Sequence, residues 1–152
     1  MFLGEYNHTI DEKGRLTLPA KWRDELSEGV VVTRGLDLCL FVFARDKFKE
    51  FADELERVGF TQADARQFSR FMMAKAMDDR PDKQGRIILP IGLREFGGLN
   101  GEALIIGSNN RIEVWNPKRY ADLNAHLETN IQDVAERMGS ILERVLFRTP
   151  SI

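Results

Sequence analysis

The sequence contains an internal repeat, and this feature limits the possible folds more than any other. DEKGRLTLPAKWR, residues 11–23, aligns without gaps with DKQGRIILPIGLR, residues 82–94, at an offset of 71 residues. Six of the thirteen positions are identical, whereas unrelated windows would share about one. The similarity continues between residues 40–55 and 111–127. We therefore expect two copies of one small module, each too small to be stable on its own.

Each copy opens with residues typical of strands joined by a tight turn. Tyr6 to Ile10 and Arg15 to Leu18 flank the turn DEKG, in which Gly14 adopts positive φ at little cost. The pattern predicts a β-hairpin or a turn between strands, with Gly85 in the same role in the second copy. Pro19 and Pro90 are expected to end the strands and open short helices.

Further strands and helices are predicted from side-chain periodicity. Four segments rich in β-branched and aromatic residues predict strands, with turns at Arg34-Gly35 and Asn109-Asn110: 30–35, 38–43, 103–107 and 111–115. An amphipathic helix is expected after each pair of strands, the first capped by Asp46 and ended by Gly59, the second beginning at Asn116 and Pro117.

The resulting domain organisation has four parts. It places a first module over residues 1–60, a connecting helix capped by Thr61 over 61–79, a second module over 80–128 and a C-terminal helix over 129–152. The methionine and phenylalanine residues of the connecting helix are interpreted as packing residues, with a ligand pocket as the alternative.

Composition limits the function classes. The 152 residues are 43% hydrophobic and 30% charged, as in globular proteins, and the sequence lacks both an apolar run of about 20 residues and a signal peptide, which favours the cytoplasm. The net charge of −2 excludes a protein that coats nucleic acid by bulk electrostatics, so any basic site must be local. The single cysteine, Cys39, is expected to be a small apolar residue in a strand.

The motifs usually needed for nucleotide chemistry and acyl transfer are missing from the sequence. The two histidines, His8 and His126, are expected on a strand and on the exposed side of a helix, and neither has metal-ligand spacing. The sequence has no P-loop, nucleophile elbow or glycine-rich dinucleotide turn. We therefore predict no catalytic residues, no metal and no cofactor, and a protein that is not an enzyme.

The duplicated Asp-x-x-Gly-Arg turn is the strongest candidate site. The aspartate can cap backbone amides of the turn, and the arginine projects a planar, permanently charged fork from the next strand. Such a fork can bind phosphate oxygens or the major-groove edge of guanine. The candidate DNA-binding residues lie in or beside the two turns: Asp11, Lys13, Arg15, Asp82, Lys83 and Arg86. Arg23 and Arg94 follow eight residues after each motif arginine and could extend the surface.

A structural interpretation of the same residues remains open. Asp11 with Arg15, and Asp82 with Arg86, could be ion pairs that only shape a hairpin, and the residue types alone favour this interpretation because exposed pairs are common and weak. The duplication does not decide between the two, since it would copy a structural pair as faithfully as a binding pair.

The chain resembles the MraZ family of bacterial regulators. The segments that carry the resemblance are residues 1–26, TRGLDLCLFVF in the middle, DARQFSRF in the connector, and DKQGRIILP with NRIEVW in the second half. It covers nearly the whole chain and weakens over about the last 30 residues. The family's Asp-x-x-x-Arg signature maps onto Asp11 with Arg15 and onto Asp82 with Arg86.

The resemblance implies a fold, a function and partners. The implied fold is α+β, with tandem AbrB-like, swapped-hairpin β-barrel modules and flanking amphipathic helices. The implied function is sequence-specific binding of double-stranded DNA at tandem promoter repeats, by a ring-shaped homo-oligomer in the cytoplasm and nucleoid. The family typically represses the division and cell-wall gene cluster, including its own operon. Two alternatives remain: an oligomer in which the Asp and Arg residues lock subunits together, and an AbrB-type antitoxin, which is usually shorter and has one module.

Overall fold

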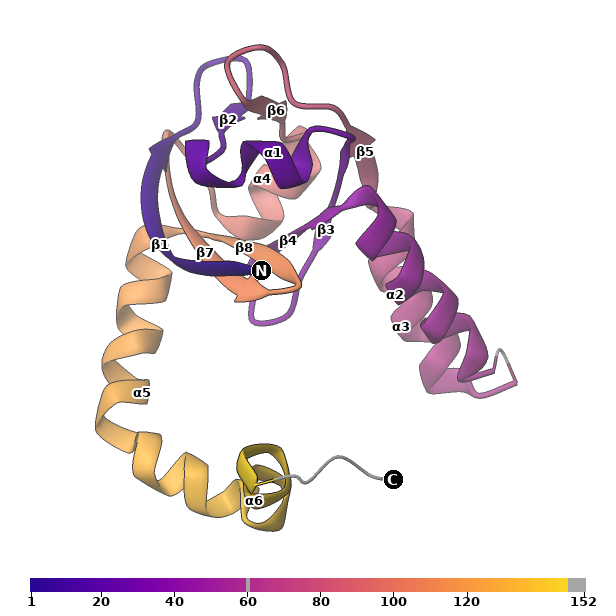
Figure 1. Ribbon diagram of the computed structural model, residues 1–152. Helices are drawn as coiled ribbons and strands as arrows, with labels where there is room; N and C mark the ends of the chain where they lie inside the picture. Colours follow the sequence, from indigo (N-terminus) through magenta and orange to yellow (C-terminus); the bar gives the residue numbers. More distant parts are fainter. Residues whose placement is uncertain (60, 148–152) are drawn as a thin grey trace. The chain divides into compact units, whose positions relative to one another are not determined.

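A computed structural model describes residues 1–59 and 61–147 of the chain. The chain divides into two compact units, Met1–Pro117 and Lys118–Ile152. The first unit holds both copies of the repeat, and its elements are shown in Figure 1. The first copy comprises β1 (Phe2–Thr9), β2 (Arg15–Thr17), η1 (Ala20–Trp22), α1 (Arg23–Leu26), β3 (Val30–Arg34), β4 (Leu40–Ala44) and α2 (Arg45–Arg57). The next segment comprises α3 (Ala63–Ala74), β5 (Met77–Asp79), β6 (Arg86–Ile88), α4 (Ile91–Gly97), β7 (Glu102–Asn109) and β8 (Arg111–Trp115).

The two copies exchange strands and build one shared sheet. Its order is β1-β7-β8-β4-β3-β5, and every neighbouring pair is antiparallel. The first strand of each copy therefore pairs with the other copy: β1 pairs with β7, and β5 pairs with β3. The strands β4 and β8 join the two halves. The mixed α+β class is confirmed, and neither copy forms a separate sheet.

The strands that follow the turns form a second, two-stranded sheet. β2 and β6 pair antiparallel, with Leu16 opposite Ile87 at the centre. These two residues are fully buried, and their sequence positions differ by the repeat offset. The pair therefore lies on an approximate two-fold axis that relates the copies. Both turns lie at the same end of the unit, next to this small sheet (Figure 1).

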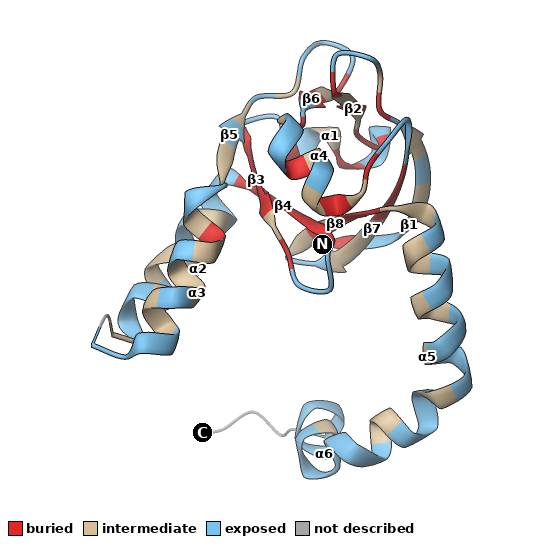
Figure 2. Cartoon of the chain, turned by 180° about the vertical axis from the view of Figure 1, so that it is seen from behind, coloured by how far each residue is buried: buried red, intermediate tan, exposed pale blue. Residues whose placement is uncertain are grey.

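The core lies between the sheets and the short helices α1 and α4. Trp22 is almost completely buried and packs edge-on against Phe2 and Tyr6, with ring centroids 5.4 and 5.0 Å away. Burial on the inward faces of the strands is visible in Figure 2. Both copies contribute large, fully buried aliphatic side chains, among them Leu16, Leu18, Leu26, Leu40, Ile87, Leu89, Ile105 and Ile112. Because either copy alone would expose half of this surface, we conclude that the two copies fold as one unit.

The helices α2 and α3 lie side by side in both views (Figures 1 and 2). The Phe51 ring of α2 stacks on Phe43 at 5.5 Å. Phe71 of α3 contacts Phe96 and the guanidinium of Arg34, which donates two hydrogen bonds to the Phe71 carbonyl. These contacts agree with the interpretation of the methionine and phenylalanine residues as packing residues.

The connecting segment differs from the prediction. The helix expected over residues 61–79 ends at Ala74, and Met77–Asp79 instead forms strand β5 on the edge of β3. The open N–H and C=O groups of β3 need hydrogen-bond partners, and this requirement outweighs the low strand propensity of Met-Asp-Asp. The helix cap is Gln62 and not Thr61.

Two local predictions in the first copy also need correction. Asp46 lies in the first turn of α2, where it faces the helix dipole, and Ala44 is the cap residue. The loop between β3 and β4 takes its left-handed residues at Asp37 and Leu38 and not at Arg34-Gly35. Of the two arrangements predicted around the first turn, a β-hairpin or a turn between strands, the structure has the turn: β1 and β2 are joined only by a bridge between Ile10 and Leu16, because each takes its main partner from the other copy.

The described part of the second unit, residues 118–147, is helical. α5 runs from Pro117 to Met138 without a break near residue 129, so the predicted start of a separate C-terminal helix there is wrong. Gly139, with φ of 50°, separates α5 from α6 (Ser140–Phe147). Several apolar side chains of this unit are exposed: Ile131, Met138, Ile141, Val145, Leu146 and Phe147. The predicted end of the helix, residues 148–152, lies outside the described residues.

Candidate nucleic-acid interface

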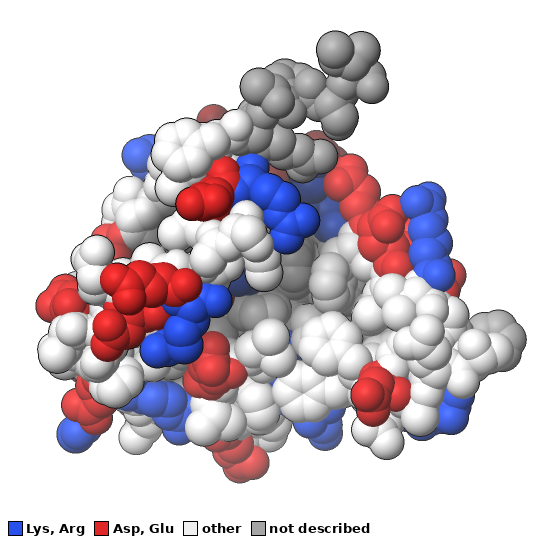
Figure 3. Space-filling model, turned by 90° about the horizontal axis from the view of Figure 1, so that it is seen from below, with Lys and Arg blue, Asp and Glu red and all other residues white. Residues whose placement is uncertain are grey.

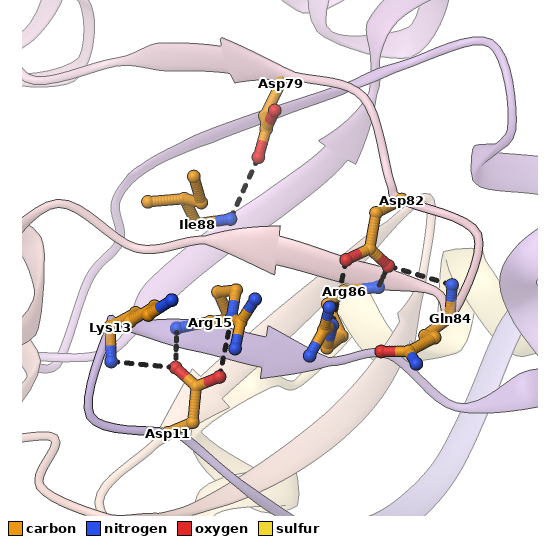
Figure 4. Close-up of polar contacts among 8 residues, drawn as sticks. All are labelled: Asp11, Lys13, Arg15, Asp79, Asp82, Gln84, Arg86 and Ile88. Atoms are coloured by element: carbon orange, nitrogen blue, oxygen red, sulfur yellow. Dashed lines mark hydrogen bonds and ion pairs between the residues drawn. The ribbon is translucent and has the colours of Figure 1, made fainter.

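The two turns have the same hydrogen-bonding pattern (Figure 4). In the first turn, Asp11 Oδ1 accepts hydrogen bonds from the backbone N–H groups of Lys13 at 3.0 Å and Arg15 at 2.9 Å. The Asp11 carbonyl accepts the Gly14 N–H at 2.9 Å. These bonds fix the backbone of the turn, as the sequence predicted.

The second turn repeats this pattern with different residues. Asp82 Oδ1 accepts from the backbone N–H groups of Gln84 and Arg86, both at 2.9 Å. The Asp82 carbonyl accepts the Gly85 N–H at 2.9 Å. The two turns therefore present equivalent frames for the arginine that follows.

Each motif arginine is bound to the aspartate of its own turn through one edge of its fork. Arg15 Nε donates to Asp11 Oδ2 at 2.6 Å, and Arg86 Nε donates to Asp82 Oδ2 at 2.8 Å. Within the described residues, neither guanidinium makes a further hydrogen bond through its terminal Nη atoms. The arginine side chains keep 31% and 26% of their surface exposed. The ion pairs of the structural interpretation are thus present, and they leave the outer edge of each fork available.

The register of the small sheet brings the two arginines to one face. Arg15 pairs with Ile88, and Thr17 pairs with Arg86. Since alternate residues of a strand point to the same side, Arg15, Thr17, Arg86 and Ile88 share the face opposite the buried Leu16–Ile87 pair. Arg15 and Arg86 are therefore diagonal neighbours, with α-carbons about 7–8 Å apart. Two forks from distant parts of the sequence are held together on a rigid base.

The two predicted lysines do not occupy equivalent positions. Both Lys13 and Lys83 are exposed in their turns. The repeat offset aligns Lys13 with Gln84 and Lys83 with Glu12, so the first turn carries an additional carboxylate. The second turn is consequently the more positive of the two.

Hydrogen bonding lowers the pKa of both turn aspartates. The backbone N–H of Arg15 contributes most to the lowered pKa of Asp11, and the backbone N–H of Arg86 contributes most to that of Asp82. The side-chain hydrogen bonds and charges of the same arginines act in the same direction. Both carboxylates are therefore ionised at neutral pH, where the arginines are also charged.

Two arginines outside the motif have a role that the sequence did not reveal. Arg94, from the second copy, packs against Gly14 of the first turn, and Arg23, from the first copy, packs against Gly85 of the second turn. Sequence reasoning placed both on an extended basic surface. Their identity in the repeat alignment marks them as equivalent, but only the three-dimensional structure shows that each one contacts the opposite copy.

The other candidate residues do not form a second site of this kind. Cys39 is buried just before β4, and burial raises the pKa of its thiol to about 12. His8 lies on β1, where burial and the charge of Arg23 lower its pKa, and His126 is exposed on α5. In the described part of the chain, no three His, Cys, Asp or Glu side chains gather in a way that could hold a metal ion. No described helix is long and apolar enough to span a membrane.

The fold and the site define a duplicated α+β protein with two matched basic turns on one face. The family described as "MraZ protein, putative antitoxin-like" matches residues 1–71 and 72–141, one match for each copy. The chain is similar to the transcriptional regulators MraZ of Syntrophomonas wolfei, with 41% identity over 91% of this chain and 96% of the relative, and of Heliobacterium modesticaldum, with 44% identity over the same shares. The relative from Desulforamulus reducens is 42% identical over 93% of this chain and its own full length.

The chain belongs to the MraZ family of transcriptional regulators. The predicted resemblance and the duplication are confirmed, and membership in a family of regulators confirms that the chain is not an enzyme. The family matches divide the chain after residue 71, whereas the module limits predicted from the sequence, 1–60 and 80–128, remain a prediction.

Proposed function

We propose that the chain binds double-stranded DNA sequence-specifically and regulates transcription through the turns around Arg15 and Arg86. The observation that carries the proposal is the shared face of the small sheet, where two partly exposed arginines are held diagonally and their Nη groups have no hydrogen-bond partner among the described residues. An Nη pair can bind two phosphate oxygens or the O6 and N7 atoms of guanine. The names of the relatives, transcriptional regulators, support the same function.

Each residue of the proposed site has a distinct role. Asp11 and Asp82 bind the Nε edges and so orient the forks of Arg15 and Arg86. Lys13 and Lys83, which are exposed and have flexible side chains, contact phosphates as point charges. The arginines supply sequence preference, and the lysines supply affinity that is independent of sequence.

The proposed target is a set of tandem promoter repeats, bound by a ring-shaped homo-oligomer of swapped-hairpin, AbrB-like barrel modules. One turn that neutralises about two phosphates gives a weak, salt-sensitive contact. Linking several turns in one body raises affinity by about 10² to 10⁴, because each further repeat is met at high effective concentration.

We further propose that the regulator represses the division and cell-wall gene cluster, including its own operon, in the cytoplasm and nucleoid. Figure 3 views the molecule from below, away from the two turns, and shows acidic and basic side chains interspersed, as expected from a net charge of −2.

Fluorescence polarisation with a labelled fragment from upstream of the chain's own gene tests this proposal. Removing the fork in Arg15→Ala or Arg86→Ala should weaken binding about tenfold to a hundredfold, the range for a bidentate base contact. The control Arg57→Ala removes an exposed arginine that is ion-paired on α2 and should bind as the wild type does. Lys13→Ala should weaken all sequences alike and reduce the salt slope by about one. Undiminished binding by both motif variants would refute the proposal.

A subunit lock is the alternative role for the same turns. It predicts that Arg86→Ala dissociates the oligomer in light scattering, while the wild type binds no promoter fragment. The intramolecular pairs at 2.6 and 2.8 Å do not favour it, because each aspartate is already bound by its own turn.

A further inference from the structure

Each basic turn rests on an arginine from the opposite copy of the repeat. We propose that Arg94 and Arg23 are positioning residues, Arg94 for the turn that carries Arg15 and Arg23 for the turn that carries Arg86. This inference rests on the proposed function for its effect on DNA binding, but its structural part is testable without DNA.

The contacts at the first turn form a chain from Gly14 to the second copy. The carbonyl of Gly14 accepts a hydrogen bond from the Leu89 N–H at 2.8 Å. The carbonyl of Leu89 in turn accepts from Arg94 Nε at 2.9 Å. A β-carbon placed on Gly14 would lie 3.0 Å from Arg94 Nε and 3.1 Å from Cζ. The guanidinium therefore lies directly against the backbone of the turn.

The second turn has the reciprocal contacts. The carbonyl of Gly85 accepts the Leu18 N–H at 2.8 Å. The carbonyl of Leu18 accepts from Arg23 Nε at 3.4 Å and Nη2 at 3.3 Å. A β-carbon on Gly85 would lie 2.8 Å from Arg23 Cζ and closer still to Nε. Both turns thus need a glycine for close approach as well as for positive φ, which is 80° at Gly14 and 75° at Gly85.

The geometry favours arginine over other side chains at positions 23 and 94. A planar guanidinium can lie flat against the glycine peptide while its Nε donates to the leucine carbonyl, and it adds a charge beneath a turn proposed to meet phosphates. Lysine offers the same charge on a flexible stem without the plane. Because the support crosses between copies, a change in one copy should disturb the turn of the other.

Hydrogen exchange of the full-length protein, followed by mass spectrometry, tests the crossed support. In Arg94→Met, the peptide covering residues 11–16 should exchange several-fold faster, because the amides of Lys13, Gly14 and Arg15 lose a fixed frame. The peptide covering residues 82–87 should be unchanged. Arg23→Met should give the reverse pattern. Faster exchange in the turn of the same copy, or equal changes in both turns, would overturn the proposal.

Conservative variants separate positioning from general destabilisation. Arg94→Lys keeps the charge and should restore protection of residues 11–16 only in part. If circular dichroism shows that Arg94→Met does not fold, Arg94→Gln replaces that variant in the same comparison. Glutamine keeps an N–H donor for the Leu89 carbonyl. Full protection of residues 11–16 in Arg94→Gln, or in the lysine variant, would also overturn the role assigned to the planar fork.

Affinity for promoter DNA provides a second test of the positioning role. Arg94→Met combined with the mild substitution Arg15→Lys should show a non-additive loss of affinity, since both act on one turn, whereas Arg94→Met with Arg86→Lys should be additive. Additive losses in both pairs would refute the functional part of the inference. A wild type that binds no promoter DNA would refute the proposed function, and the exchange experiment would still decide the crossed support.

Discussion

Asp79 accepts a hydrogen bond from the backbone N–H of Ile88 at 2.9 Å and so ties the end of β5 to the strand that carries Arg86 (Figure 4). The repeat offset places His8 at the corresponding position of the first copy. The imidazole of His8 lies near Arg23 and has a lowered pKa. The two basic turns are therefore equivalent in their own hydrogen bonds but differ in how the chain enters them.

Removing the hydrogen bond between Asp79 and Ile88 should make the second turn, and not the first, less rigid. Asp79→Ala is expected to reduce the free energy of unfolding by about 1–2 kcal/mol, because the two backbone hydrogen bonds that Asp79 accepts, from Ile88 and Arg80, are lost at a partly exposed site. It should also weaken promoter binding several-fold. Asp78→Ala is the matched control, since among the described residues the Asp78 side chain forms only an exposed ion pair, with Arg45 at 3.2 Å. Urea denaturation and fluorescence polarisation measure the two effects, and equal results for both variants would contradict the prediction.

The glycines of the turns should not tolerate a side chain. Gly14→Ala has to accommodate positive φ and a contact with Arg94, whereas Gly101→Ala has a similar φ of 78° with nothing within 4 Å of the new β-carbon. We expect Gly101→Ala to cost about 1 kcal/mol from backbone strain alone and Gly14→Ala to cost more. Thermal unfolding of the two variants measures the difference. Equal losses would mean that the Arg94 contact relaxes freely.

Acid should weaken the turns through their aspartates. The pKa of Asp11 and of Asp82 lies below the ordinary value of 3.8 in the folded state. Their contribution to stability is therefore present in full above that value and is lost as pH falls below it towards the folded pKa. The double variant Asp11→Asn, Asp82→Asn should lack this part of the acid response. Unfolding free energies measured between pH 5 and about pH 3 should converge for the two proteins at the acid end, and parallel curves would contradict the assignment.

The thiol of Cys39 should be unreactive in the folded protein. Cys39 is fully buried, its pKa is raised to about 12, and its sulfur lies 3.1 Å from the Leu36 carbonyl. Since the thiolate is the reactive form, Ellman's reagent at neutral pH should modify it only after unfolding. The rate of modification should therefore follow the rate of unfolding by denaturant. Rapid modification of the native protein would show that the loop before β4 opens readily.

Much of the local structure was predictable from the sequence. The repeat alignment located β2 and β6, because Gly14 and Gly85 mark turns and the following residues have strand character. It also identified the aspartates that cap those turns and the arginines that follow. Hydrophobic periodicity located α2 because its apolar residues face the sheet at helical spacing. These features depend on short segments of chain and on residue-specific preferences.

The pairing of strands from one copy with strands of the other was not predictable in the same way. Alternating side chains indicate which face of β1 is buried, but they do not identify β7 as its partner. The strand β5 is formed because the edge of β3 lacks partners, not because Met-Asp-Asp favours a strand. The placement of Arg94 on Gly14 follows from this exchange and is therefore visible only in the folded chain.

The pairing of β1 with β7 also has a consequence for synthesis. On the ribosome, Phe2 has no strand partner until Asn109 has been made, a delay of about five to twenty seconds at usual elongation rates. During that time the nascent chain carries an unpaired strand and an incomplete apolar surface, so we expect chaperones to bind it. A gene split between the two copies would therefore yield two insoluble fragments, not two half-active regulators.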